Sequence, residues 1–96
     1  MRKGWVYIVT NKPFGPLYAG VTNDLRRRIG EHKEKRGSAF ASRYGLTRLV
    51  YFEEHERILA AIQREKNIKE WPRLWKLNLI EGLNPKWDDL FDGLPF

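Results

Sequence analysis

Hydrophobic residues cluster in three short stretches that are rich in β-branched and aromatic side chains, a composition typical of strands. These stretches predict strands at 5–9, 17–21 and 48–54. Three longer stretches carry helix-start and helix-end signals and predict helices at 25–35, 56–71 and 72–81. The loop 11–16 between the first two strands is dense in turn-forming residues, so we expect a hairpin there.

Single residues indicate where the helices begin and end. The residues 22–24 offer several N-caps directly before Leu25. Pro72 ends one helix, because its ring cannot continue the hydrogen-bond ladder, and it suits the first position of the next helix. Gly82 is the expected C-cap of that last helix.

The order of these elements, β-β-α-β-α-α, predicts an α+β fold with a small three-stranded, mainly antiparallel sheet flanked by helices. The segment 36–46 is expected to be a loop with room for one helical turn, and 84–96 an irregular tail. At 96 residues, one domain spanning 1–96 is the default.

Two polar residues interrupt the inward stripe of the first predicted helix. Helical spacing from Leu25 places Arg28, Ile29 and His32 on the same face. Arg28 and His32 lie four residues apart, so their side chains are neighbours. One interpretation is that both lie at the core boundary, with their stems covering apolar surface and their heads in water. The other is a functional pair.

A carboxylate interrupts the second predicted helix in a similar way. Its apolar stripe runs through Ala61, Ile62 and Ile68, and Glu65 falls between them. A carboxylate on an apolar face must be paired, bound to a metal or open to a cleft. A salt bridge to a nearby basic residue and a metal site both remain open at this point.

The predicted hairpin carries two tyrosines and a glycine that are further candidates for a functional site. Alternation places Tyr7 on the same strand face as Trp5 and Val9, and Tyr18 on the same face as Gly20. Packing alone accounts for most strand tyrosines. Gly20, however, leaves room for another group to approach the backbone.

Charge and cysteine content restrict the partners and the compartment. The net charge is +6, and residues 1–48 hold eleven Lys and Arg against three Asp and Glu. Such a basic half suggests a polyanionic partner, or else a solvated face. The absence of cysteine excludes disulfides and thiolate zinc sites and favours the reducing cytoplasm. No apolar run is long enough to predict a membrane helix, so no membrane partner is expected.

Two phenols, a guanidinium, an imidazole and a carboxylate suit phosphodiester chemistry. With this set, the sequence resembles the GIY-YIG nuclease family, and most closely its small stand-alone bacterial members. The tripeptides WVY (5–7) and YAG (18–20) stand at the two motifs that name the family. The remaining family positions are matched by Arg28, His32 and Glu65, with Asn84 at a late asparagine seen in some members. Trp5 and Ala19 depart from the motifs at framework positions.

The resemblance implies a metal-dependent endonuclease that hydrolyses DNA, with structure selectivity or weak sequence specificity. Glu65 would hold one Mg²⁺ or Mn²⁺ ion, and Arg28 would bind the scissile phosphate. His32 would assist at the phosphate or orient Arg28, and Gly20 and Asn84 would support the site. Tyr7 or Tyr18 would position or deprotonate water; Tyr7 is the preferred base. We expect the five catalytic residues to converge on one concave surface.

The partner is expected to be DNA, with RNA not excluded, and a protein partner or homodimer could supply targeting. The nucleic-acid-binding residues predicted from the basic half are Lys12, Arg26, Arg27, Lys33, Lys35, Arg36, Arg43 and Tyr44. Two other functions stay open: a non-catalytic nucleic-acid-binding module on the same fold, and an interaction domain with a buried polar network. Metal-dependent nicking separates the first function from the others, and salt-sensitive DNA affinity separates the remaining two.

Overall fold

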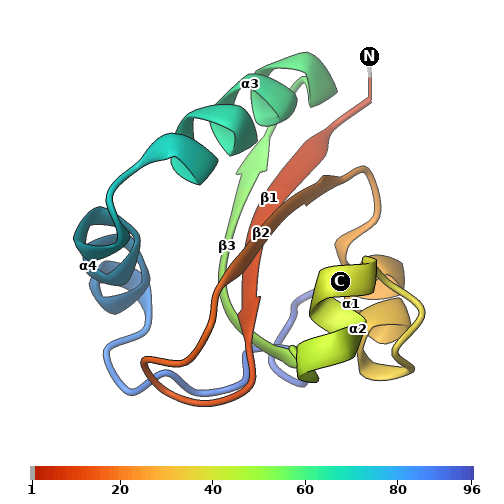
Figure 1. Ribbon diagram of the computed structural model, residues 1–96. Coiled ribbons are helices and arrows are strands. Elements are labelled where there is room, and N and C mark those ends of the chain that lie inside the picture. Colours follow the sequence, from red (N-terminus) through yellow and green to blue (C-terminus); the bar gives the residue numbers. More distant parts are fainter. Residues whose placement is uncertain (1) are drawn as a thin grey trace.

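A computed structural model describes residues 2–96 of the chain and confirms the predicted sheet (Figure 1). Its strands are β1 (Gly4–Thr10), β2 (Tyr18–Thr22) and β3 (Arg48–His55). The strand order is β2-β1-β3, and both pairings are antiparallel. The β1–β2 hairpin places Tyr7 directly opposite Gly20. The fold is therefore α+β, as the sequence predicts.

Four helices complete the fold within the described residues. They are α1 (Leu25–Lys33), α2 (Ala39–Tyr44), α3 (Ile58–Glu70) and α4 (Arg73–Leu83). The helical turn expected within 36–46 is α2, which Ser38 caps at its start and Gly45 ends in the left-handed conformation. The prediction for Gly82 is wrong, since α4 continues through it to Leu83 and has Asn84 as its C-cap. Gly82 has open space around it and adopts the helical backbone without steric cost.

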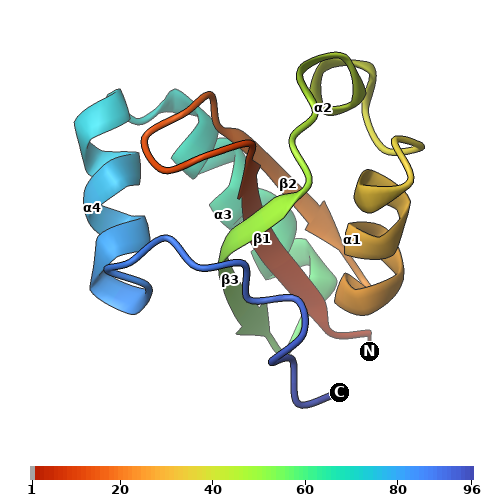
Figure 2. The ribbon, with the colours of Figure 1, turned by 90° about the horizontal axis from the view of Figure 1, so that it is seen from below.

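The helices cover the two faces of the sheet separately (Figures 1 and 2). Val6 and Ile8 of β1 point into a core shared with α3 and α4. Tyr7 and Val9 point to the other face, where α1 and α2 pack. This division follows from strand alternation, and it places Tyr7 beside the interrupted stripe of α1.

The C-terminal segment is irregular, as expected, but it is well anchored. It crosses the face that carries α1 (Figure 2), where the Leu90 backbone N–H donates to the carbonyl of Leu49. Its last residue, Phe96, stacks on Trp5 with 5.4 Å between ring centroids. Within residues 2–96, none of the helices combines the length and the apolarity that crossing a bilayer would require.

Candidate active site

A chain of hydrogen bonds joins three of the predicted site residues. The Tyr7 hydroxyl lies 2.8 Å from Nε2 of His32, and Nε of Arg28 donates to the same hydroxyl over 3.3 Å. Arg28 also bonds Glu31 one turn further along α1, with 3.2 Å between Nη1 and Oε1. Because Asp24 caps α1 through the N–H of Arg27, the helix begins where Arg28 and His32 both face β1.

Burial distinguishes the members of this chain. Tyr7 is fully buried and His32 is 2% exposed, whereas about a third of the Arg28 side chain is in contact with solvent. The boundary interpretation therefore holds for Arg28 but is wrong for His32. Arg28 connects a buried phenol–imidazole pair to the surface.

Tyr7 and His32 are both uncharged at neutral pH. Burial is the main cause that lowers the pKa of His32 to about 4, and the positive charge of Arg28 adds to it. Burial also raises the pKa of Tyr7 to about 12, although the Arg28 hydrogen bond opposes this shift. At neutral pH a protonated phenol thus shares a hydrogen bond with a neutral imidazole, and the tautomer of His32 sets the direction of that bond. The Nδ1 atom of His32 is buried without a hydrogen-bond partner among the described residues.

The free energy of unfolding should depend on pH, because His32 is neutral in the folded protein. Its pKa is lower in the folded protein than the usual 6.5, so the unfolded chain binds the proton first as the pH falls. Stability is expected to fall by about 2–3 kcal/mol between pH 7 and pH 4.5 from this group. Urea titrations across this range should show a weaker pH dependence for His32→Gln, and an identical slope in both proteins would contradict the assignment.

Gly20 makes room for the Tyr7 phenol, not for an external group. A Cβ atom at Gly20 would lie 2.4 Å from the Tyr7 hydroxyl oxygen and 2.4 Å from its Cζ. Gly37 does the same for His32, since a Cβ there would lie 2.4 Å from Nδ1. Two glycines therefore border the hydrogen-bonded pair from opposite ends.

Gly20→Ala is expected to displace the Tyr7 ring, lower stability by about 1–3 kcal/mol and reduce any activity of the site. Gly30→Ala is the matched control, because a Cβ at Gly30 meets nothing within 4 Å and alanine favours a helix by about 0.5–1 kcal/mol. Thermal melts of both variants check the prediction. A Gly20→Ala protein as stable as the wild type would show that the phenol is not held as described.

Glu65 reaches this cluster from the other side of the sheet. It lies on α3, its side chain is 14% exposed, and Lys69 pairs with it at 3.4 Å. The Lys69 ammonium also lies 5.5 Å from the ring centroid of Tyr18, and the Tyr18 ring is 5.7 Å from that of His32. The negative charge of Glu65 contributes to the raised pKa of Tyr7. Tyr7, Tyr18, Arg28 and His32 thus lie together beside the edge strand β2, and Lys69 links Glu65 to them.

Of the two interpretations of Glu65, the structure contains the salt bridge, but this salt bridge is weak. Lys69 is about half exposed, and its pairing with Glu65 is long. Within residues 2–96, this ammonium is the one partner that the structure gives to the Glu65 carboxylate. A mostly buried carboxylate with so few partners fits a divalent cation.

No cluster of three or more acidic, histidine or cysteine ligands occurs within residues 2–96. Glu65 would therefore supply one protein ligand. This suits Mg²⁺, which commonly binds through one or two carboxylates together with phosphate oxygens and waters. The residues present fit an ion that binds together with its substrate.

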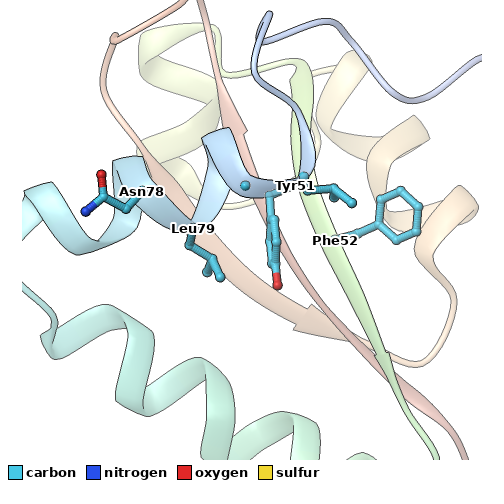
Figure 3. Close-up of a pocket in the computed structure, with 6 residues that line it drawn as sticks. Tyr51, Phe52, Asn78 and Leu79 are labelled. Carbon is cyan, nitrogen blue, oxygen red and sulfur yellow. The ribbon is translucent and has the colours of Figure 1, made fainter.

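Asn84 and two open pockets lie apart from this cluster. Asn84 is buried and donates to the carbonyls of Val50 and Asp88, so its contacts anchor the C-terminal segment. One open pocket lies between β3 and α4 (Figure 3), lined by Tyr51, Phe52, Asn78, Leu79, Gly82 and Leu83. A second is lined by Phe52, Leu83, Asp88, Asp89, Leu90 and Gly93. Neither contains any of the five predicted catalytic residues.

The predicted nucleic-acid-binding residues divide into two groups. Arg26 donates to the carbonyls of Leu94 and Phe96, and Lys33 donates to the carbonyl of Thr47 and pairs with Asp89. These two side chains therefore hold the C-terminal segment. The other group is exposed and consists of Lys12, Arg27, Lys35, Arg36, Arg43 and Tyr44. Within it, Arg36 pairs with Glu34.

Four residues of the cluster were missed by sequence reasoning: Glu31, Gly37, Phe40 and Lys69. Glu31 and Lys69 could have been found, because they stand three and four residues after Arg28 and Glu65 on helices. Gly37 and Phe40 lie in the segment expected to be mainly loop, where no periodicity indicates what a side chain faces. Phe40 stacks on Tyr18 with 6.5 Å between ring centroids.

A buried imidazole and phenol, a partly exposed guanidinium and a carboxylate can activate water and neutralise a phosphate. Comparison with known proteins agrees with this chemistry. The model of the GIY-YIG catalytic domain matches residues 3–78. No solved structure gave a significant match.

Bacterial relatives match over most of their own length. A UPF0213 protein of Staphylococcus saprophyticus is 36% identical over 80 residues, which are 83% of this chain and 96% of the relative. A UPF0213 protein of Clostridium perfringens is 39% identical over 82 residues, 85% of this chain and 87% of the relative. The match of the catalytic-domain model over most of the chain, together with these relatives, confirms the resemblance: the chain belongs to the GIY-YIG nuclease family.

Proposed function

We propose that this protein is a metal-dependent endonuclease that hydrolyses phosphodiester bonds in DNA. The observation that carries the proposal is the hydrogen-bonded chain from Arg28 through Tyr7 to His32. It joins a cation suited to a phosphate with a phenol and a neutral imidazole that accepts a proton. Family membership supports the same function.

Tyr7 and His32 would act together as the base. The raised pKa of Tyr7 makes a free phenolate rare at neutral pH. The phenol can still take a proton from water if it passes its own proton to Nε2 of His32, which lies 2.8 Å away. His32 is neutral, and burial disfavours its charged form, so the imidazole would take that proton only while negative charge develops beside it. Tyr7 therefore remains the preferred base, with His32 as its proton acceptor.

Arg28 would bind the scissile phosphate. Its guanidinium is the most exposed member of the hydrogen-bonded chain, and its partner on the solvent side is Glu31. A phosphate oxygen would replace Glu31 as that partner, since a charge-assisted bond to phosphate can be bidentate. Such an exchange also brings the substrate up to the otherwise buried Tyr7 hydroxyl. The same guanidinium would stabilise negative charge in the transition state.

Glu65 would hold one Mg²⁺ or Mn²⁺ ion. A bound divalent ion supplies charge neutralisation at the phosphate and lowers the pKa of its water. Lys69 would leave Glu65 when the ion binds and would remain close to Tyr18, where a phosphate or a base can meet it. Tyr18 would position the attacking water or the substrate.

DNA affinity is expected to fall steeply with salt. If the five exposed cations Lys12, Arg27, Lys35, Arg36 and Arg43 each contact a phosphate, raising salt from 50 to 200 mM should weaken duplex binding about 10²–10³-fold. Replacing Arg27 and Arg43 with glutamine should flatten this dependence. Replacing Arg57, an exposed residue at the start of α3, should leave it unchanged. Fluorescence anisotropy checks both, and affinity independent of salt would contradict the assignment.

One observation favours a second function, a nucleic-acid-binding module without catalysis. The Tyr7 hydroxyl is fully buried, as in a structural hydrogen-bond network, while the exposed cations Lys12, Arg27 and Arg43 would still bind phosphates. A cleavage assay separates the two functions. It incubates flapped, forked, nicked and plain DNA duplexes and single-stranded RNA with Mg²⁺, with Mn²⁺ or with EDTA. Binding without cleavage of any substrate would favour the second function.

A further inference from the structure

A row of aromatic rings leads from the hydrogen-bonded cluster to the surface. The Tyr18 ring stacks near Phe40, with 6.5 Å between centroids and 26° between planes. Phe40 in turn contacts Tyr44, with 4.9 Å between centroids and 48° between planes. Since Tyr18 lies 5.7 Å from His32, the row begins at the proposed catalytic centre. Its outer members both belong to α2.

The outer rings are exposed although the helix that carries them is fixed. Phe40 and Tyr44 are each 46% exposed. Between them, Ala41 is buried in the core and anchors α2. The loop before β2 adds a further contact, because Asn11 donates to the carbonyl of Tyr44. Two aromatic faces are therefore held at the surface in a defined place, without a partner among the described residues that covers them fully.

Cationic side chains lie beside this row of aromatic rings. The Arg43 guanidinium lies 5.7 Å from the centroid of the Tyr44 ring, and the Lys69 ammonium lies 5.5 Å from that of Tyr18. Lys35 and Arg36, in the loop that precedes α2, are exposed as well. Aromatic rings among cations favour nucleobases with their phosphates over an apolar protein segment.

We propose that Phe40 and Tyr44 form a base-stacking subsite for unpaired nucleotides that adjoin the cleaved phosphodiester. A paired base has both faces covered by its neighbours in the duplex, whereas an unpaired base is free to stack on a protein ring. The preferred substrate is then single-stranded or flapped nucleic acid, rather than plain duplex. This inference rests on the proposed nuclease function, since it names the substrate class of that site.

The test compares the wild type with a Phe40→Leu/Tyr44→Leu variant, which keeps apolar volume on α2 and removes the rings. The matched control is Trp75→Leu, another exposed aromatic residue, which lies on α4. Binding of a fluorescein-labelled twelve-nucleotide oligo-dT and of a plain hairpin duplex is measured in EDTA, where metal-dependent cleavage cannot occur. We expect the double variant to lose affinity for the single strand about ten-fold or more and to keep its duplex affinity. Trp75→Leu should match the wild type.

A second measurement needs no variant. A single strand with a 2-aminopurine base should lose fluorescence on binding the wild type, because stacking quenches that base. A strand of abasic spacers should bind about as weakly as oligo-dT binds the double variant. Unchanged oligo-dT affinity in the double variant, equal losses for duplex and single strand, or abasic strands that bind as well as oligo-dT would each overturn the proposal.

The binding results separate the subsite from the nuclease function. Ring-dependent binding of single strands by a protein that cleaves no nucleic acid would leave the subsite in place and refute the nuclease. The reverse result is metal-dependent cleavage that is as fast on plain duplex as on a single strand and that the double variant leaves unchanged. It would support the nuclease and refute the subsite.

Discussion

Glu65→Gln is expected to abolish cleavage and to leave the fold intact. Glutamine keeps the shape of the side chain and removes the charge that would hold the metal ion. The loss of transition-state stabilisation should be about 3 kcal/mol or more, a rate decrease of about 10²-fold or greater. DNA affinity in EDTA should hold or increase, because a negative charge is removed beside a surface that meets phosphates.

The structure also limits what this substitution costs in stability. Lys69 is about half exposed, so the loss of its partner leaves an ammonium in water and should cost less than about 1 kcal/mol. Lys69→Gln is the matched control: it breaks the same salt bridge and keeps the proposed metal ligand. A Glu65→Gln protein that melts far below the wild type, with Lys69→Gln unaffected, would favour a purely structural role for the carboxylate.

Tyr7→Phe should have the second largest effect. It removes the hydroxyl that joins Arg28 to His32 and with it the proposed base, so single-turnover cleavage should slow by about 10²–10⁴-fold. The Nε2 atom of His32 loses its partner inside the core, which should cost about 1–3 kcal/mol of stability.

Tyr51→Phe separates these two consequences. The Tyr51 hydroxyl is part-buried, and it bonds Glu53 at 2.5 Å in a network with His55 and Arg64, away from the cluster. This control should lose stability and keep the wild-type cleavage rate. Thermal melts and cleavage time courses of both variants give the comparison. Equal rates for Tyr7→Phe and wild type would remove Tyr7 from the mechanism.

Most of the fold could be predicted, because β-branched strands and proline or N-cap boundaries are local signals. The predicted and observed bounds of the strands differ by one residue at five of the six strand ends and coincide at the sixth. One failure had a tertiary cause. Gly82 continues α4, since the chain turns only where Asn84 bonds Val50. The bonds from Arg26 and Lys33 to carbonyls of distant segments were also not predicted, because no local pattern indicates such contacts.

The candidate site was predictable to a different extent at each residue. Helical spacing alone placed Arg28 beside His32, and the interrupted stripe marked Glu65. The approach of Tyr7 to α1 followed only from the family resemblance, because it depends on the hairpin register that sets Tyr7 opposite Gly20. The neutral state of His32 could not be predicted from the sequence, because it depends on how deeply the imidazole is buried.

Single-turnover cleavage of a 5′-labelled flapped DNA by the wild type, in Mg²⁺ and in EDTA, tests the central claim most directly. The substrate offers an unpaired strand and a duplex, so it contains a target for either cleavage preference. We expect strand cleavage in Mg²⁺, none in EDTA, and none in Mg²⁺ with Glu65→Gln. An intact flap after prolonged incubation of folded, DNA-bound wild type with Mg²⁺ or Mn²⁺ would contradict the proposal that this cluster is a nuclease site.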